Sequence, residues 1–264
     1  MIQEEKCKAL IGDCPIGSAL LIKEVTDSTN LDIRKAAEAG AAHGLVAVAE
    51  QQTAGKGRRG RSWVSPPGEN LYFSILLRPK LSAQETAALT PVMAIAVAQA
   101  ARSIGLDGKI KWPNDVVING KKVCGILTEL FFREEHDFYV VIGTGINVNQ
   151  PGFPEEIQDR ATSFFQEKKE LIDREALLAK VLHFFAEYYA NLEACGDLSG
   201  LRSIYESLLV NLHAQVEVLD PQGAWKGVAE GIDDRGELLV RHSDGRLEAV
   251  FAGEVSVRGI YGYV

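Results

Sequence analysis

The sequence predicts an α+β protein in which a mixed, largely antiparallel sheet packs against helices and is followed by a small C-terminal β-barrel. Three observations support this prediction. Short apolar runs typical of strands alternate with amphipathic helical stretches through most of the chain. An Asn119-Gly120 pair separates two strand-like runs, which indicates an antiparallel hairpin. After residue 212 the pattern changes to short strands separated by turn residues, so we divide the chain into a main domain, 1–212, and a small domain, 213–264.

The first elements surround a glycine-rich segment. Ala19 to Val25 is a β-type run, and the helix that follows it, from residue 31, is preceded by capping side chains at 28–30. Leu45 to Glu50 and Asn70 to Leu77 are two further apolar strands. The glycine-rich segment between them is therefore expected to be held by two strands of the sheet.

The middle of the chain predicts one long helix and three paired strands. The alanine-rich stretch 84–104 has helical spacing, with Pro91 either just after a Thr90 cap or at a kink. The runs 116–118, 123–130 and 138–147 predict an antiparallel meander.

The last part of the chain predicts two helices and then the barrel. Asp173 caps a helix with apolar residues at helical spacing up to Leu192, and residues 198–208 continue that pattern in a second helix. Turn residues then separate the runs 216–219, 228–232, 237–240, 248–251 and 255–260.

A strongly cationic loop stands out in an acidic chain. The segment Gly55 to Arg61, GKGRRGR, carries four positive charges between glycines, whereas the whole chain has a formal net charge of −8. Glycines let the backbone come close to a ligand, and arginine binds phosphate or carboxylate oxygens in pairs. The segment is typical of an anion-binding loop, and the acidic remainder argues against a protein that coats nucleic acid.

Composition also narrows the class of protein. The four cysteines form no C-x-x-C pair and lack histidines at metal-ligand spacing, so neither a zinc site nor a disulfide framework is expected. The start of the chain lacks the apolar stretch of a signal peptide, and no run approaches the length of a membrane span. We expect a soluble cytoplasmic protein.

Polar and charged residues gather where predicted strands end, which is where sheet-based domains assemble their sites. Each group also has a purely structural interpretation. Residues 28–30 could act only as caps, the cationic loop could be a solvated linker or an RNA contact, and 112–115 could be only a turn. Lys122 could be a solvated surface lysine, and the short 143–145 G-x-G is weak on its own.

Taken together and in this order, these segments closely resemble the biotin protein ligases, also called biotin–[acetyl-CoA-carboxylase] ligases. The resemblance runs from about residue 19 to the C-terminus. The cationic loop followed by KWPND is far more specific than either part alone. The segments that carry it are Asp27 to Asn30, Gln52, Gly55 to Trp63, Lys111 to Asp115, Lys122 to Gly125 and Gly143 to Asn149.

The resemblance implies a fold like that of class II synthetases and biotin ligases, and a two-step reaction. The carboxylate of biotin attacks the α-phosphate of ATP to give biotinyl-5′-adenylate, and the biotinyl group then passes to a lysine of a biotin carboxyl carrier domain. It implies biotin and ATP as substrates and Mg²⁺ as a cofactor. Because the glycine-rich loop carries arginines that repel one another, we expect it to be poorly ordered when empty and to close over the ligand.

The resemblance also implies roles for individual residues. Lys122 and Arg58 are the expected catalytic residues, because they can stabilise charge on the carboxylate and the α-phosphate. Asp115 is the expected metal contact, and Ala252 to Glu254 either approach the ATP or acceptor or have only a structural role. The expected biotin contacts are Ser28, Thr29, Asn30, Gln52, Lys56, Gly57, Arg58, Lys122 and Gly125. The expected ATP contacts are Arg58, Arg61, Trp63, Asn114, Asp115, Lys122 and Asn147.

Two other functions compete with this one. A lipoyl or octanoyl ligase or transferase would share the fold, but the cationic loop and KWPND favour biotin. A nucleic-acid binder would use the same loop, but it lacks interleaved aromatic residues. Too few residues precede Ser28 for a helix-turn-helix domain, so we expect a monofunctional enzyme without DNA binding. The sequence is compatible with a homodimer, and we expect no membrane as a partner.

Overall fold

The main sheet in the computed structural model has seven strands in the order β1-β2-β3-β7-β6-β5-β4. The structure describes residues 1–134, 137–220, 223–252 and 256–259. Strands β1 and β2 pair in parallel, and every other neighbouring pair is antiparallel. The strands are β1 Leu20–Thr26, β2 Val46–Gln52, β3 Leu71–Leu77, β4 Lys109–Lys111, β5 Asp115–Ile118, β6 Lys121–Glu134 and β7 Asp137–Ile146. The predicted mixed, largely antiparallel sheet is confirmed.

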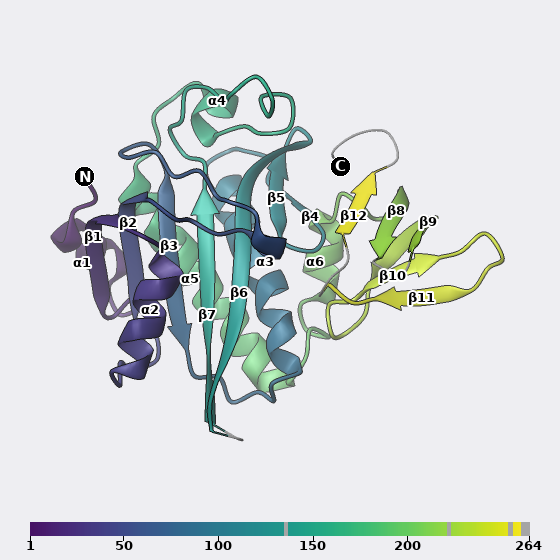
Figure 1. Cartoon of the computed structure of the whole chain (residues 1–264), viewed down its shortest axis with the longest axis horizontal. Helices are drawn as coiled ribbons and strands as arrows, with labels where there is room; N and C mark the ends of the chain where they lie inside the picture. Colours follow the sequence, from purple (N-terminus) through teal and green to yellow (C-terminus); the bar gives the residue numbers. More distant parts are fainter. Residues whose placement is uncertain (135–136, 221–222, 253–255, 260–264) are drawn as a thin grey trace.

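Helices cover both faces of this sheet, as Figure 1 shows. Helices α3 (Leu89–Arg102) and α5 (Arg174–Cys195) bury their apolar residues in the large core on one face. Helix α2 (Thr29–Glu38) packs on the other face, where Ile33 and Ala37 meet a second apolar cluster. Because layers lie on both sides, all seven residues of β3 are buried. The remaining helices are α1 Glu4–Ile11, η1 Arg58–Gly60, η2 Glu85–Ala88, α4 Phe164–Lys168 and α6 Arg202–Leu208.

A second, antiparallel sheet follows at the C-terminal end and stands beside the first (Figure 1). Its strands pair in the order β11-β10-β9-β8-β12, and no ladder joins β11 to β12 within the described part of the chain. The indole Nε1 of Trp112 donates to the carbonyl of Gly236 at 3.0 Å, which ties the two sheets together. The strands are β8 Gln215–Asp220, β9 Gly223–Ile232, β10 Leu238–Arg241, β11 Leu247–Val250 and β12 Ser256–Gly259. The predicted last strand, 255–260, extends at both ends outside the described residues.

Several local expectations are confirmed or corrected. The Asp173 side chain accepts from the Ala176 amide at 3.0 Å, so the predicted cap of α5 is confirmed. Pro91 lies in the first turn of α3, where its missing N–H costs nothing, and Ala88 rather than Thr90 is the N-cap. Ser28 occupies the N-cap position of α2 but makes no side-chain cap hydrogen bond, so the capping interpretation of its hydroxyl is wrong.

Four short elements were not expected from the sequence, namely α1, η1, β4 and α4. Helix α1 packs against α5, and β4 extends the sheet beyond β5. Strand β4 has only three residues, too few for a period-2 pattern to stand out. All four cysteines are free thiols, as expected. In the described ranges no helix is both long and apolar enough to cross a membrane.

Candidate active site

One cavity of about 980 Å³ gathers the predicted site residues from separate parts of the chain. The segment that joins β2 to β3 crosses the face of the sheet toward β5 (Figure 1). The cationic loop in this segment contributes residues to the cavity lining. Every predicted biotin or ATP contact lines this cavity except Asn147. Those residues are Ser28, Thr29, Asn30, Gln52, Lys56, Gly57, Arg58, Arg61, Trp63, Asn114, Asp115, Lys122 and Gly125.

A chain of hydrogen-bonded polar groups forms part of the cavity lining. The Gln52 amide oxygen accepts from the Thr29 N–H at 3.0 Å and from the Thr29 hydroxyl at 3.2 Å. The Gln52 amide nitrogen donates to the Ser65 hydroxyl at 3.1 Å, and that hydroxyl donates to the Trp63 carbonyl. The start of α2 is therefore linked by hydrogen bonds to the end of the cationic loop.

Two residues that the sequence analysis missed complete this polar chain. Ser74 lies on β3, and its hydroxyl is 2.6 Å from the Thr29 hydroxyl and 2.5 Å from the Asn30 amide oxygen. Glu129 lies on β6 and accepts from the Asn30 amide nitrogen at 2.6 Å. Within their own strands neither residue differs from an ordinary polar strand residue, so only the pairing of β3 and β6 around β7 reveals their role.

The cationic loop has a defined backbone. Arg59 adopts a left-handed conformation (φ 58°) inside the short helix η1, and the loop is pinned by bonds from Gly57 N–H to Arg61 O at 2.7 Å and from Trp63 N–H to Gly55 O at 2.9 Å. A Cβ on Gly55 would lie 2.6 Å from the Trp63 carbonyl oxygen, so the close approach of these two backbones requires a glycine there.

Arg58 connects three parts of the molecule. Its Nη1 donates to the Asn114 amide oxygen at 3.1 Å, and its Nη2 donates to the Ala252 carbonyl. Burial lowers the pKa of Arg58 from its usual value, and the Asp115 carboxylate opposes that effect. A guanidinium remains charged at neutral pH, so Arg58 keeps its positive charge in the cavity. Ala252 therefore approaches the cationic loop, while Gly253 and Glu254 lie outside the described residues.

Lys122 lies at the centre of the arrangement. Its Nζ is 2.6 Å from Asp115 Oδ1 and 5.3 Å from the centre of the Trp63 ring. Its backbone N–H donates to Arg160 O at 2.8 Å, and its carbonyl accepts from the Thr162 N–H at 2.9 Å. The ion pair and these backbone bonds fix the ammonium group in one place.

Trp63 lies directly on the floor of the cavity. A Cβ on Gly145 would lie 2.5 Å from the Trp63 Nε1 and Cε2 atoms, and one on Gly125 would lie 2.8 Å from its Cζ3 atom. The two glycines, on β7 and β6, thus make room for the indole ring.

Asn147 is the predicted site residue that the structure does not bring to the cavity. Its amide nitrogen donates to the Thr162 carbonyl at 3.0 Å, so it supports the segment that pairs with Lys122. Asp159 and Arg160, from that same segment, line the cavity and were not predicted. Asp159 and Arg160 lie in a turn region without strand or helix periodicity, so no local sequence pattern marks them as site residues.

The chain matches two families over most of its length. Residues 22–147 match the biotin/lipoate A/B protein ligase family, and residues 214–258 match the biotin protein ligase C-terminal domain. The bifunctional ligase/repressor BirA of Bacillus subtilis is 36% identical over 245 residues, which cover 92% of this chain and 75% of that relative. The biotin–[acetyl-CoA-carboxylase] ligase of Paracoccus denitrificans is 34% identical, with 89% of this chain and 98% of that protein covered.

A solved structure gives the same result. The biotin protein ligase of Aquifex aeolicus in complex with biotin and ATP is 33% identical, with a TM-score of 0.79, and the match covers 91% of this chain and 99% of that one. The expected family resemblance is confirmed on sequence and on fold. This chain, whose cationic loop and KWPND segment meet in one cavity, belongs to the biotin protein ligases of the biotin/lipoate A/B protein ligase family.

Proposed function

We propose that this protein joins biotin to ATP as biotinyl-5′-adenylate and then transfers the biotinyl group to a lysine of a biotin carboxyl carrier domain. The observation that supports it most is the convergence of Lys122, Arg58 and Arg61 on a cavity that Thr29, Asn30 and Gln52 of the polar chain also line. Biotin has an anionic carboxylate at one end and a polar ureido ring at the other, which suits such a cavity. The related Aquifex ligase binds both biotin and ATP.

The polar chain is the proposed end for the biotin ring. Ser28, Thr29 and Gln52 can offer hydroxyl and amide groups to the ureido atoms, and the backbones of Gly57 and Gly125 allow the ligand to come close. Asn30 is already bonded to Ser74 and Glu129, so it orients the start of α2 beside the ligand.

The cationic side chains are the proposed site of the reacting anions. Two unit charges ~4 Å apart repel by about 4 kcal/mol at an effective dielectric near 20, so the carboxylate and the α-phosphate meet only where cations offset that repulsion. Arg58, Arg61, Lys56 and Lys122 line the cavity and can supply this charge, and Trp63 can cover the bound nucleotide.

In the first step a carboxylate oxygen forms a bond to the α-phosphorus, and the bond from that phosphorus to the bridging oxygen breaks to release pyrophosphate. Lys122 stabilises the added negative charge on the phosphoryl oxygens, because its Nζ is held at a fixed position by Asp115. In the second step a carrier lysine amine attacks the biotinyl carbonyl carbon, AMP leaves, and the amine loses its proton.

Mg²⁺ fits this site only as a partner of the nucleotide. In the described ranges no three His, Cys, Asp or Glu side chains gather into a metal cluster, and Asp115 is paired with Lys122. Mg²⁺ is often held by one or two carboxylates together with substrate phosphates. Asp115 and Asn114 would be the residues that hold the metal, and the metal would supply further charge neutralisation at the triphosphate.

The test is a single-turnover assay of adenylate formation with biotin and α-labelled ATP. Lys122→Ala should slow adenylate formation by about 10²- to 10³-fold, the usual cost of losing one preorganised charge donor in an active site. Lys180→Ala, on the exposed side of α5, is the matched control. Full activity of Lys122→Ala, with folding checked by circular dichroism, would remove Lys122 from the catalytic residues.

The same assay separates biotin from the rival acyl substrates. Lipoate and octanoate are supplied in place of biotin, with carrier domains of both kinds as acceptors. Faster use of lipoate or octanoate than of biotin would contradict the proposal.

The cytoplasmic location, the absence of DNA binding and a homodimer stay predictions, and sedimentation with and without biotin and ATP tests the last of them.

A further inference from the structure

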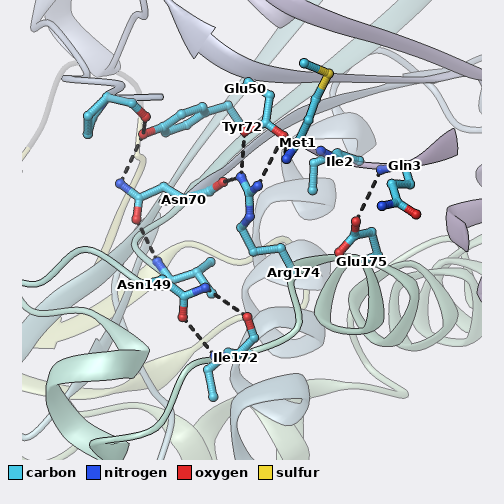
Figure 2. Close-up of polar contacts among 12 residues, drawn as sticks. Met1, Ile2, Gln3, Glu50, Asn70, Tyr72, Asn149, Ile172, Arg174 and Glu175 are labelled. Carbon is cyan, nitrogen blue, oxygen red and sulfur yellow. Dashed lines mark hydrogen bonds and ion pairs between the residues drawn. The ribbon is translucent and has the colours of Figure 1, made fainter. Parts of the chain in front are cut away.

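A buried arginine outside the cavity bonds to β2 and to the residue before β3, the two strands that flank the cationic loop (Figure 2). Arg174, at the start of α5, donates from Nη1 and Nη2 to the two carboxylate oxygens of Glu50 at 2.9 and 3.1 Å. The same Nη1 donates to the Asn70 carbonyl at 3.0 Å. Glu50 is near the end of β2 and Asn70 directly precedes β3. One guanidinium therefore links the place where the chain leaves the sheet to the place where it returns, with the cationic loop in between.

Further hydrogen bonds connect Asn70 to the segment between the cationic loop and β3. The Asn70 amide nitrogen donates to the Tyr72 hydroxyl at 3.0 Å, and that hydroxyl donates to the Pro66 carbonyl at 3.0 Å. Burial raises the pKa of Tyr72, so its hydroxyl keeps the proton that this bond needs. The Asn70 amide oxygen also accepts from the Val148 N–H at 2.9 Å, directly after Asn147.

We call Glu50, Asn70, Tyr72 and Arg174 the loop clamp. None of the four lines the cavity. Asn70 is 1% exposed, Tyr72 0% and Arg174 9%. A buried ion pair often adds no net stability over apolar residues of the same size, because both charges must be desolvated. Directional hydrogen bonds can hold the loop at a defined geometry, which apolar side chains would not do.

We propose that the loop clamp positions the cationic loop, with Arg174 and Tyr72 as positioning residues for adenylate formation. Arg174 holds the end of β2 and the start of β3 at one separation, and Tyr72 draws Pro66, which follows the cationic loop, toward the sheet. Arg58, Arg61 and Trp63 are thereby held on the side of the cavity that Lys122 also lines. The effect on catalysis rests on the proposed function, whereas the effect on the loop does not.

The first experiment is Tyr72→Phe, which keeps the ring and removes only the hydroxyl. The ligand-free protein is treated briefly with trypsin, and cleavage at Lys56, Arg58, Arg59 and Arg61 is quantified by mass spectrometry against cleavage elsewhere. We expect loop cleavage to rise by about 2- to 10-fold, which corresponds to one hydrogen bond of ordinary strength. Tyr205→Phe is the matched control, because the buried Tyr205 hydroxyl has no hydrogen-bond partner within the described part of the chain.

The second experiment separates positioning from general stability. Arg174→Lys keeps a positive charge near Glu50 but cannot make the three bonds of the guanidinium. We expect both Arg174→Lys and Tyr72→Phe to raise the KM for ATP more than the KM for biotin, at temperatures well below their thermal midpoints. Glu50→Gln combined with Arg174→Met removes both charges and should show the same loop cleavage as Arg174→Lys.

Unchanged loop cleavage in both Tyr72→Phe and Arg174→Lys would overturn the proposal, and so would an equal rise in Tyr205→Phe. A lower thermal midpoint without selective loop cleavage would also overturn it, because that is the result of a purely structural role. Cleavage is measured without biotin or ATP. A wild-type protein that makes no adenylate would therefore refute the proposed function and leave the cleavage comparison intact.

Discussion

At the scale of single residues, glycines decide how closely the site can pack. The Asn30 side chain packs against the backbone of Gly143, and the ring of Trp63 packs against the backbones of Gly125 and Gly145. A methyl group at any of the three positions would meet another atom at less than 3 Å. The glycines on β6 and β7 thus shape the floor of the cavity, although each looks like an ordinary interruption of a strand in the sequence.

Gly145→Ala tests this floor. The added Cβ would lie 2.5 Å from the Trp63 ring, so the ring must move, and we expect the closed arrangement of the loop to lose about 1–3 kcal/mol. Bound adenylate should then hydrolyse faster, which is measured by following labelled adenylate after removal of free ATP. Gly152→Ala is the matched control, because nothing lies within 4 Å of its added Cβ. Equal adenylate lifetimes in the two variants would contradict this account of Trp63.

At the scale of elements, α5 does more than cover the sheet. Its first residue, Arg174, reaches β2 and the start of β3, and its N-cap residue, Asp173, pairs with Lys6 of α1 at 2.7 Å. One helix therefore joins the N-terminal helix and the two strands that carry the cationic loop. The periodicity of α5 predicts its apolar contacts, but the long-range polar contacts of its first turn require the folded structure.

The Glu50–Arg174 pair gives a pH prediction at this scale. Burial opposes ionisation of Glu50, but hydrogen bonds from Arg174 and from the Ile2 N–H outweigh it, so the pKa of Glu50 lies below its usual 4.5. The Met1 amino group also faces this carboxylate. A lowered pKa means that the pair stabilises the fold above about pH 4.5, and that this contribution is lost as the pH falls further.

Urea unfolding between pH 3 and pH 7 measures the effect. The free energy of unfolding of the wild type should exceed that of Glu50→Gln near pH 7, and the difference should shrink as the pH falls below 4.5. The adenylation chemistry of the site is not involved, so activity is not needed as a readout. A difference that stays constant from pH 7 to pH 3 would show that Glu50 is not ionised in the folded protein.

At the scale of the whole molecule, charge is unevenly distributed. The chain has a net charge of −8, yet the cavity is lined by Lys56, Arg58, Arg61 and Lys122. The acidic remainder repels nucleic acids and other polyanions in general, while the local cations attract a small anion that fits the cavity. The second sheet takes part as well, because Arg58 bonds to the Ala252 carbonyl and Trp112 bonds to the Gly236 carbonyl.

Salt should therefore weaken the binding of ATP more than that of biotin. ATP carries several negative charges and biotin only one, and the screening length falls from about 30 Å at 0.01 M salt to about 8 Å at 0.15 M. We expect the KM for ATP to rise more steeply than the KM for biotin over this range. Arg61→Gln should flatten the ATP curve. Equal salt dependence for the two substrates would contradict a nucleotide site built on these cations.

Much of the site could be predicted because its segments are local and chemically unusual. Gly55 to Arg61 concentrates charge within a few residues, and Lys111 to Asp115 combines residue types that are rare side by side. Ser74, Glu129, Arg160 and Arg174 could not be predicted in the same way. Each is a common polar residue whose partner lies 35 or more positions away along the chain.

The order of residues alone determined most of the strands and the longer helices, the position of the cationic loop between two strands, and the family of ligases to which the chain belongs. Periodicity and local charge are short-range properties, so they can be recognised without coordinates. The tertiary structure alone decided that Asn147 supports a neighbouring segment, that Trp63 rests on two glycines, and that Arg174 bonds to the two strands that flank the cationic loop. Those contacts join residues brought together by strand pairing and helix packing, and their geometry depends on the whole fold.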